Sequence, residues 1–355
     1  MRTRLLRLVR ISCLLTVVAT SGFATNSWAA QATSTKSATP KAAAKARPTV
    51  KKATAATTSA RARRARLARI RASARARELR EAQEPQYKFD ANGGIVPDIR
   101  AEAAIIYNPE NGQVLWEENS QNKRSIASIT KIMTAAVFLE GDPDLTREVV
   151  VQRSDVRAAS TTFIRAGYKL TTGDLLHLLL IGSDNAAARA LARVSPYGST
   201  GFIDRMNDKA IELGLENTAY ADPSGLLSAN VSSAYDMAKL IAFVSADDRI
   251  AKVMQMQQYG LKVGRRTVTV NSTNRLVREG DVDVQAGKTG FIRAAGYCLA
   301  TLLRLPQGGP QVAVVVLGAK SNAGRFWETR HLFNWLSGKA GELFSTPVAA
   351  AEVAQ

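Results

Sequence analysis

The sequence predicts an α+β fold, in which an antiparallel sheet assembled from both ends of one domain packs against a cluster of helices. Three observations lead to this fold class. A hairpin pattern opens the domain, a block of helical patterns fills its middle, and three strand patterns precede a final helix. We place this domain at residues 85–340, a region with enough apolar residues for a sizeable core.

Residues 1–29 have the pattern of a signal peptide for export. Four arginines precede the apolar stretch ISCLLTVVATSGFA, and Ser27 and Ala29 occupy the small-residue positions that a signal peptidase reads. The alternative is an uncleaved anchor, for which the apolar stretch is short. Signal removal would leave Cys298 as the sole cysteine, which excludes an intramolecular disulfide and a paired-cysteine metal site. We therefore expect an exported, periplasmic or otherwise extracytoplasmic protein.

The positive charge of the chain is concentrated before the domain. Residues 1–84 hold 19 Lys and Arg against 3 Asp and Glu, which leaves 29 against 27 for the remainder. Residues 30–84 are rich in Ala, Lys and Arg and have almost no large apolar side chain, so we predict a disordered basic tether. Its second half consists of good helix formers and could become helical on an anionic surface.

Two roles are open for the basic tether. It could attract acidic envelope polymers or lipid headgroups, or it could be a solvated spacer. Nucleic acid is disfavoured as a partner, because the chain is exported and no aromatic residue in the tether could stack on bases.

The elements of the domain follow in order. Residues 101–120 predict two strands joined by a turn at Asn108–Gly112, and residues 125–139 predict a helix with an apolar stripe. Four more helices are expected at 171–182, 186–195, 201–214 and 232–245. Strands are expected at 282–291, 296–305 and 311–319, followed by a helix at 325–338.

Ser128 and Lys131 are the first candidates for catalysis. A serine hydroxyl needs a base, and neither His177 nor His331 has a Ser and Asp/Glu constellation around it in the sequence. A lysine that is held neutral by burial and a neighbouring cation can serve instead. Ser128 and Lys131 are three residues apart, so on a helix they lie on one face, and Ser128 falls on its first turn. A second match to Ser-x-x-Lys begins at Ser120, in a polar stretch that we assign to a surface loop.

Two further tripeptides strengthen the first match. Ser183-Asp184-Asn185 follows an apolar helix, and Lys288-Thr289-Gly290 ends a strand. A phosphate-binding loop is the alternative for the second tripeptide, but it fails because six residues separate Gly280 from the Gly before Lys288 and no helix pattern follows.

The ordered motifs SITK, SDN and KTG resemble those of the penicillin-binding proteins and serine β-lactamases. The segments SIASITKIMTA and AGKTGFIRAAGYCLA are similar to the low-molecular-mass class of D-alanyl-D-alanine peptidases. The resemblance covers residues 100–340. It implies the transpeptidase-like fold of that superfamily, a serine D,D-peptidase acting through an acyl-enzyme, peptidoglycan stem peptides as substrates, and β-lactams as covalent inhibitors. It implies no metal and no cofactor.

The resemblance also implies catalytic roles. Ser128 would attack a D-Ala carbonyl, with Lys131 as its general base. Ser183 would pass a proton to the leaving nitrogen, and Asn185 would hold Lys131 and the substrate amide. Asp184, which lies between two site residues, is expected to be structural.

Substrate binding is implied for the last motif. Lys288 and the Thr289 hydroxyl would bind a substrate carboxylate, and Lys288 would help to keep Lys131 neutral. The oxyanion hole would consist of the backbone amides of Ser128 and Phe291, the second on an edge strand just after Gly290.

Three functions remain in competition. We favour a D,D-peptidase that cuts cross-links in preference to trimming terminal D-Ala. A β-lactamase would need a dedicated acid for deacylation, and no Glu-x-x-x-Asn segment lies between Asn185 and Lys288. A non-catalytic envelope-binding protein would not need all three motifs. Because 65 residues follow Gly290, and residues 341–355 form a tail without a cationic amphipathic face, we expect a soluble single-domain enzyme.

Overall fold

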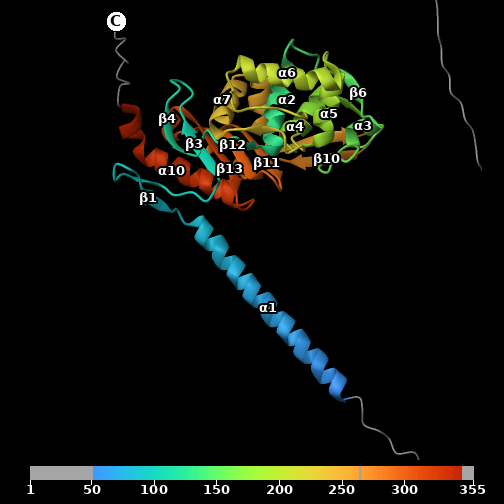
Figure 1. The fold of residues 1–355 in the computed structure, drawn as a ribbon. Helices are drawn as coiled ribbons and strands as arrows, with labels where there is room; N and C mark the ends of the chain where they lie inside the picture. The colour runs from blue at the N-terminus through green and yellow to red at the C-terminus, as the bar shows by residue number, and fades with distance from the viewer. Residues whose placement is uncertain (1–50, 264–265, 346–355) are drawn as a thin grey trace, which may run out of the picture. The chain divides into compact units, whose positions relative to one another are not determined.

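The computed structural model describes residues 51–263 and 266–345 (Figure 1). The chain divides into two units, one up to Arg66 and one from Leu67 onward, and helix α1 (Lys51–Gln83) continues through this boundary. Within the described ranges, no helix is both long enough and apolar enough to cross a bilayer. The predicted signal peptide, residues 1–29, lies outside the described residues.

Helix α1 corrects the prediction of a disordered tether. The tether was expected to span residues 30–84, but residues from Lys51 to Gln83 are helical. The physical reason is composition: alanine and arginine are strong helix formers, and neither glycine nor proline occurs between these two residues. Residues 30–50 lie outside the described part of the chain.

A five-stranded antiparallel sheet has the strand order β11-β12-β13-β3-β4. Its strands come from the two ends of the domain, as predicted: β3 (Ala103–Tyr107) and β4 (Val114–Glu118) from the early hairpin, and β11 (Asp283–Ile292), β12 (Gly296–Arg304) and β13 (Gln311–Ala319) from the late strands. The hairpin closes where Gly112, with a φ of 77°, donates its N–H to the carbonyl of Asn108. Strand β11 is an edge strand, with one neighbour in this sheet.

The two faces of the sheet are buried in separate clusters. Along β3, Ala103 and Ile105 belong to the larger cluster with the helices, while Ala104 and Ile106 belong to the cluster under the final helix. Helix α10 (Gly324–Ser345) covers that second face and extends past the predicted limit of the domain at residue 340. Phe344 packs against the second cluster, so residues 341–345 are helix and only 346–355 of the predicted tail lie outside the described residues.

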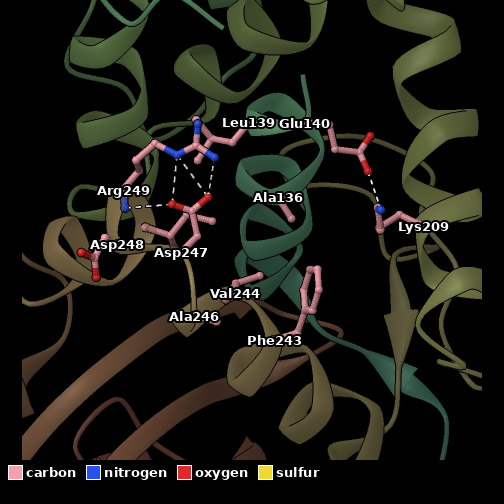
Figure 2. A pocket seen from close by; sticks show the side chains of 11 residues that line it. Ala136, Leu139, Glu140, Lys209, Phe243, Val244, Ala246, Asp247, Asp248 and Arg249 are labelled. Atoms are coloured by element: carbon pink, nitrogen blue, oxygen red, sulfur yellow. Dashed lines mark hydrogen bonds and ion pairs between the residues drawn. The ribbon is translucent and has the colours of Figure 1, made fainter. Parts of the chain in front are cut away.

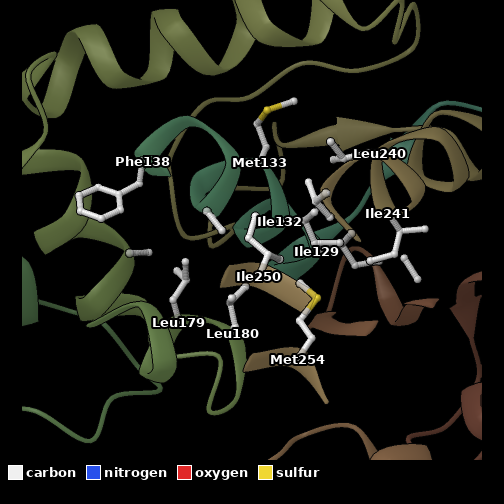
Figure 3. Close-up of a cluster of buried hydrophobic side chains, with 14 of the residues drawn as sticks. Ile129, Ile132, Met133, Phe138, Leu179, Leu180, Leu240, Ile241, Ile250 and Met254 are labelled. Carbon is white, nitrogen blue, oxygen red and sulfur yellow. The ribbon is translucent and has the colours of Figure 1, made fainter. Parts of the chain in front are cut away.

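Helix α2 (Lys131–Leu139) lies at the centre of the helical cluster (Figures 1 and 3). Every residue of α2 except Ala136 is buried, and Ile132 and Phe138 pack beside Leu179 and Ile250 from neighbouring helices. A helix that is apolar on all sides needs such a central position. The helices around it are α4 (Thr172–Leu180), α5 (Asn185–Val194), α6 (Gly198–Glu212), α7 (Ala234–Ser245) and α8 (Asp248–Met254).

Short elements complete the structure. Apart from the 3₁₀ helix at Ala127–Thr130, which lies within the helix predicted at 125–139, the sequence patterns did not predict them. They are β1 (Tyr87–Phe89), β2 (Ile95–Pro97), β5 (Arg124–Ser125), β6 (Glu148–Val150), α3 (Arg153–Val156), β7 (Lys169–Thr171), β8 (Val231–Ser232), β9 (Gln258–Val263), β10 (Arg266–Asn271), α9 (Arg275–Glu279), and the 3₁₀ helices η1 (Ala127–Thr130) and η2 (Pro306–Gly308).

Candidate active site

A cavity of about 450 Å³ opens beside the edge strand β11 and brings the three predicted motifs together. The residues that line it come from η1, from the loops after α3, α4, α6 and β10, from the start of α5, from β11 and the residue after it, and from α10. They are Ser128, Ser160, Thr161, Gly182, Ser183, Asn185, Leu226, Thr273, Thr289, Gly290, Phe291, Ile292, Arg293 and Arg325.

The sequence predicted that Ser128 lies on the first turn of an α-helix. In the structure it lies in a turn of 3₁₀ helix instead. Helix α2 begins only at Lys131. Ala127 has a φ of 48°, an unusual value for a residue with a side chain. The close packing of Gly225 accompanies this turn: a Cβ atom on Gly225 would lie 2.0 Å from the Ala127 carbonyl oxygen. The packing of Gly225 against Ala127 therefore fixes the backbone next to Ser128.

Lys131 is fully buried, and its Nζ is surrounded by three oxygen atoms. Ser128 Oγ lies at 3.0 Å, Asn185 Oδ1 at 2.6 Å and the Ser224 carbonyl oxygen at 2.5 Å. Burial lowers the pKa of Lys131 to about 7, despite the nearby carboxylates of Asp222 and Asp184. A neutral amine fits this environment: its two N–H groups can donate to the amide and carbonyl oxygens, and its lone pair can accept from the serine hydroxyl.

The Ser224 carbonyl is positioned by a loop that the sequence patterns did not single out. The Asp222 carboxylate accepts N–H bonds from Ser224 at 2.6 Å, Gly225 at 2.9 Å and Leu227 at 2.7 Å. Burial alone would raise the pKa of Asp222, but these bonds and those from side chains lower it overall. A short polar stretch, DPSG, was the only signal for this loop.

Ser183 and Asn185 face the cavity, and Asp184 between them does not. Ser183 has a φ of 58°, which turns the chain between α4 and α5. The buried Asp184 carboxylate caps α5 by accepting the Ala187 N–H at 2.9 Å, and it also accepts the Phe163 N–H at 2.6 Å. Asp184 is thus structural, as expected, and it fixes the residues on either side.

Lys288 is the second buried lysine of the site. Its Nζ donates to Ser183 Oγ at 2.9 Å and to the Thr289 carbonyl at 3.1 Å. Burial, with the charges of Lys131 and Arg325 nearby, lowers the pKa of Lys288 well below its usual value. The prediction that this motif ends a strand is wrong, because β11 continues past it to Ile292.

Gly290 and Phe291 shape the edge of β11. A Cβ atom on Gly290 would lie 2.6 Å from the Ile126 carbonyl oxygen, so only glycine lets β11 approach the turn that carries Ser128. The Phe291 side chain is half exposed and stacks on Tyr297, with ring centroids 4.2 Å apart. Next to them, Thr289 Oγ1 lies 2.7 Å from Thr273 Oγ1.

Arg325 on α10 is a site residue that the sequence analysis missed. Its buried guanidinium donates to the Gly290 carbonyl at 2.9 Å and to the Cys298 carbonyl at 3.1 Å, and its Nε has no hydrogen-bond partner. Nothing in the pattern of the last helix distinguishes this arginine from the other charged residues there. Through these two bonds Arg325 links α10 to β11 and β12.

Other candidates from the sequence lie elsewhere. Ser120 is in a loop, as predicted, but its side chain is buried and donates to Glu117. His177 Nδ1 bonds with the Gly173 carbonyl, and His331 Nε2 bonds with the Gln83 carbonyl. Within residues 51–263 and 266–345, no three His, Cys, Asp or Glu side chains gather in a way that could hold a metal ion.

A second cavity, of about 530 Å³, lies at the opposite end of α2 (Figure 2). Leu139 and Phe243 contribute apolar surface to it, and the ion pair of Arg249 with Asp247 also lines it. No serine, threonine or cysteine lines it, so the nucleophile chemistry belongs to the cavity beside β11.

Comparison with known proteins decides the family. A model of the family described as D-alanyl-D-alanine carboxypeptidase matches residues 90–321. The chain belongs to this family of serine peptidases. It is a D-alanyl-D-alanine peptidase with the penicillin-binding fold, and the α+β class and the resemblance predicted from its motifs are confirmed.

Several relatives are similar over most of the domain. A D-alanyl-D-alanine endopeptidase of Escherichia coli is 32% identical over 258 residues, which cover 72% of this chain and 82% of that protein. A D-alanyl-D-alanine carboxypeptidase of Bacillus subtilis is 32% identical, with 62% of this chain and 58% of that protein covered. The crystal structure of a Streptomyces DD-transpeptidase is 29% identical with a TM-score of 0.64, covering 69% of this chain and 98% of that one.

Proposed function

We propose that Ser128, Lys131, Ser183 and Asn185 are the catalytic residues of this D-alanyl-D-alanine peptidase. The observation that carries the proposal is the buried Lys131 amine, 3.0 Å from Ser128 Oγ, with two other oxygens that can only accept. This arrangement lets the amine take the hydroxyl proton without first losing one to solvent.

Acylation then proceeds as follows. Lys131 Nζ accepts the proton of Ser128, and Oγ bonds to the carbonyl carbon of the D-Ala on the acyl side of the scissile bond. The negative oxygen is stabilised by the backbone N–H groups of Ser128 and Phe291. The leaving nitrogen receives a proton from Lys131 through the Ser183 hydroxyl, the C–N bond breaks, and an ester remains on Ser128. Water hydrolyses this ester, with Lys131 again taking a proton.

Lys288, Thr289 and the backbone of Gly290 and Phe291 bind the substrate in this proposal. Lys288 and the Thr289 hydroxyl lie on β11 beside Ser183, where a carboxylate on the leaving side would reach both. Cross-linked and terminal D-Ala stems both present such a carboxylate, so one site can accept either.

Labelling with a fluorescent penicillin tests the catalytic assignment. The β-lactam should form a lasting adduct on Ser128, and Ser128→Ala should abolish it, while Ser120→Ala provides the matched control from the second Ser-x-x-Lys match. Rapid turnover of the adduct would favour a β-lactamase, and an absence of reaction would favour a binding protein. An adduct located on another serine by mass spectrometry would refute the assignment of the nucleophile.

Among substrates, we favour cross-linked stems over terminal D-Ala. Three relatives named D-alanyl-D-alanine endopeptidase are matched over 78%, 82% and 82% of their length, whereas the carboxypeptidases from Bacillus subtilis and Escherichia coli are matched over 58% to 63%. Both reactions share one acyl-enzyme, so the preference lies in how the leaving amine is accommodated.

Purified cross-linked dimers and pentapeptide monomers decide between these substrates. We expect the dimer to be cleaved with the higher kcat/KM. Preferential release of free D-Ala from monomers would overturn the endopeptidase preference and leave the catalytic residues unaffected.

The location follows from the substrate: peptidoglycan lies outside the cytoplasm, and residues 1–29 would direct export. The basic segment, residues 30–84, would then bind an anionic surface of the envelope by charge. Its described arginines from Arg61 to Arg71 are exposed along α1. Deletion of residues 31–84 should weaken binding to isolated cell walls or anionic membranes at low salt and leave hydrolysis of a small peptide unchanged. Equal binding with and without the segment would support the spacer role.

A further inference from the structure

The hairpin of β1 and β2 presents three large apolar side chains to solvent. Tyr87, Phe89 and Ile95 are 52%, 75% and 55% exposed. Phe89 pairs directly with Ile95 across the hairpin, and Tyr87 is two residues before Phe89, so all three share one face. We call these three residues the hairpin face.

The hairpin makes several contacts with the rest of the domain, so this exposure does not come from a loose segment. Val96 packs against the second hydrophobic cluster, and Lys88 forms an ion pair with Glu118 at 2.6 Å. The Trp335 indole also donates to the Ile95 carbonyl at 3.2 Å. These contacts with β4 and α10 hold the hairpin face outward.

The hairpin face is also distinct from ordinary surface apolar residues. Other strongly exposed apolar side chains, such as Val150 and Ile211, lie singly on different elements. Single exposed residues are normal on soluble proteins, but a cluster of aromatic and aliphatic side chains marks an interaction surface. Tyr87 and Phe89 precede residue 90, where the match to the family begins, and Ile95 lies just inside that match.

Cationic surface directly precedes the hairpin face in the chain. Helix α1 ends at Gln83, four residues before Tyr87, and the Gln83 carbonyl bonds with His331 Nε2 on α10. Among its exposed arginines, α1 also exposes Leu67 and Ile70, which are three residues apart and share one side of the helix. The exposed arginines of α1 and the apolar hairpin face are therefore neighbours in the sequence.

We propose that the hairpin face inserts into the headgroup region of an anionic phospholipid bilayer, with the arginines of α1 binding the lipid headgroups. The inference rests on the anionic partner proposed above for the basic segment and identifies it. A polysaccharide polyanion would need only the charges, whereas a bilayer offers both anionic headgroups and an apolar layer for exposed Tyr, Phe and Ile. Tyrosine is enriched at that interface in membrane proteins.

Vesicle sedimentation with the purified protein tests the inference. The probes are vesicles of phosphatidylglycerol with phosphatidylcholine, vesicles of phosphatidylcholine alone, and isolated cell walls. We expect the triple variant Tyr87→Ser, Phe89→Ser, Ile95→Ser to bind the anionic vesicles at least about tenfold more weakly than the parent. The reason is that it loses the free energy of binding that partial burial of these large side chains in the bilayer contributes. Its binding to cell walls and its hydrolysis of a small peptide should be unchanged.

The matched control removes equally exposed apolar residues elsewhere, in the double variant Val150→Ser, Ile211→Ser, which should bind like the parent. A second measurement does not depend on loss of binding: the variant Phe89→Trp should show a blue-shifted tryptophan emission, relative to the parent, on anionic vesicles, and Ile211→Trp should not.

The outcomes separate this inference from the proposed charge interaction. Unchanged vesicle binding by the triple variant together with unshifted Phe89→Trp emission would overturn insertion. Salt-sensitive binding to cell walls with no binding to vesicles would also overturn it and leave the charge interaction intact. If the parent bound neither surface at low salt, both proposals would fail.

Discussion

The pH dependence of acylation gives the most direct test of Lys131 as the base. With a pKa of about 7, the neutral amine should rise from about one tenth of the protein at pH 6 to about nine tenths at pH 8. The rate of acylation by a β-lactam should therefore increase about tenfold over this range and then level off. A lysine with its usual pKa of 10.5 would instead give about a hundredfold increase without a plateau.

A substitution at Asn185 tests whether the midpoint of this pH profile belongs to Lys131 or to Lys288, the other buried lysine. Asn185→Asp places a carboxylate where the amide oxygen lies 2.6 Å from Lys131 Nζ. An added negative charge within about 4 Å stabilises a cation by about 4 kcal/mol at an effective dielectric constant of about 20, which is about three pKa units. The midpoint should move from about 7 towards 10.

Stopped-flow acylation with a chromogenic β-lactam, followed from about pH 5 to pH 10, measures this midpoint. Ser183→Ala is the control, because Ser183 Oγ accepts its hydrogen bond from Lys288 in the structure and the substitution adds no charge beside Lys131. It should slow acylation without moving the midpoint. The reasoning is refuted if Asn185→Asp and the parent share one midpoint, or if Ser183→Ala moves it as far.

Three further substitutions test the supporting structure. Gly225→Ala should abolish penicillin labelling, since its Cβ would collide with the Ala127 carbonyl, and a folded variant with normal labelling by gel assay would contradict this. Asp184→Asn should lower stability by about 2 kcal/mol in urea unfolding, because an amide cannot accept from both Phe163 N–H and the α5 amide as a carboxylate does, and it should slow acylation as well. Burial raises the pKa of Glu328 to about 7 from 4.5, so the folded protein binds more protons than the unfolded chain between these values and stability falls as pH rises through them. Glu328→Gln should remove up to about 3 kcal/mol of this pH dependence, whereas identical stability curves of the variant and the parent from pH 5 to pH 8 would refute the raised pKa.

Much of the fold could be predicted because its strongest signals are local. The alternation of β3, the turn at Asn108–Gly112 and the apolar stripe of α2 each follow from side-chain period and turn chemistry. The short strands β9 and β10 were missed because their pairing is set by contact partners rather than by a strong apolar alternation. The disorder predicted for the basic segment does not hold for Lys51–Gln83, because low hydrophobicity argues against a core and not against an exposed helix.

Some residues of the candidate site could be predicted from the sequence, and others could not. Ser128 with Lys131, and Lys288 with Thr289, could be found because short spacing along one element brings the paired groups together. Arg325 could not be found, because its contact with Gly290 joins residues 35 positions apart and depends on how α10 packs on the sheet. Loop contacts such as the Ser224 carbonyl have no side-chain signature at all, since the group that bonds to the lysine is backbone.

The electrostatics of the two lysines were only partly foreseeable. Lys288 was expected to keep Lys131 neutral, yet the first cause of the low pKa of Lys131 is burial in the core that surrounds α2, while Lys131 in turn lowers the pKa of Lys288. Two buried amines in one site cannot both be charged without a large cost in desolvation and mutual repulsion. A substrate carboxylate at Thr289 would favour the charged form of Lys288, and that charge would favour the neutral form of Lys131. Substrate binding would thus prepare the base at the moment when the Ser128 proton must be removed.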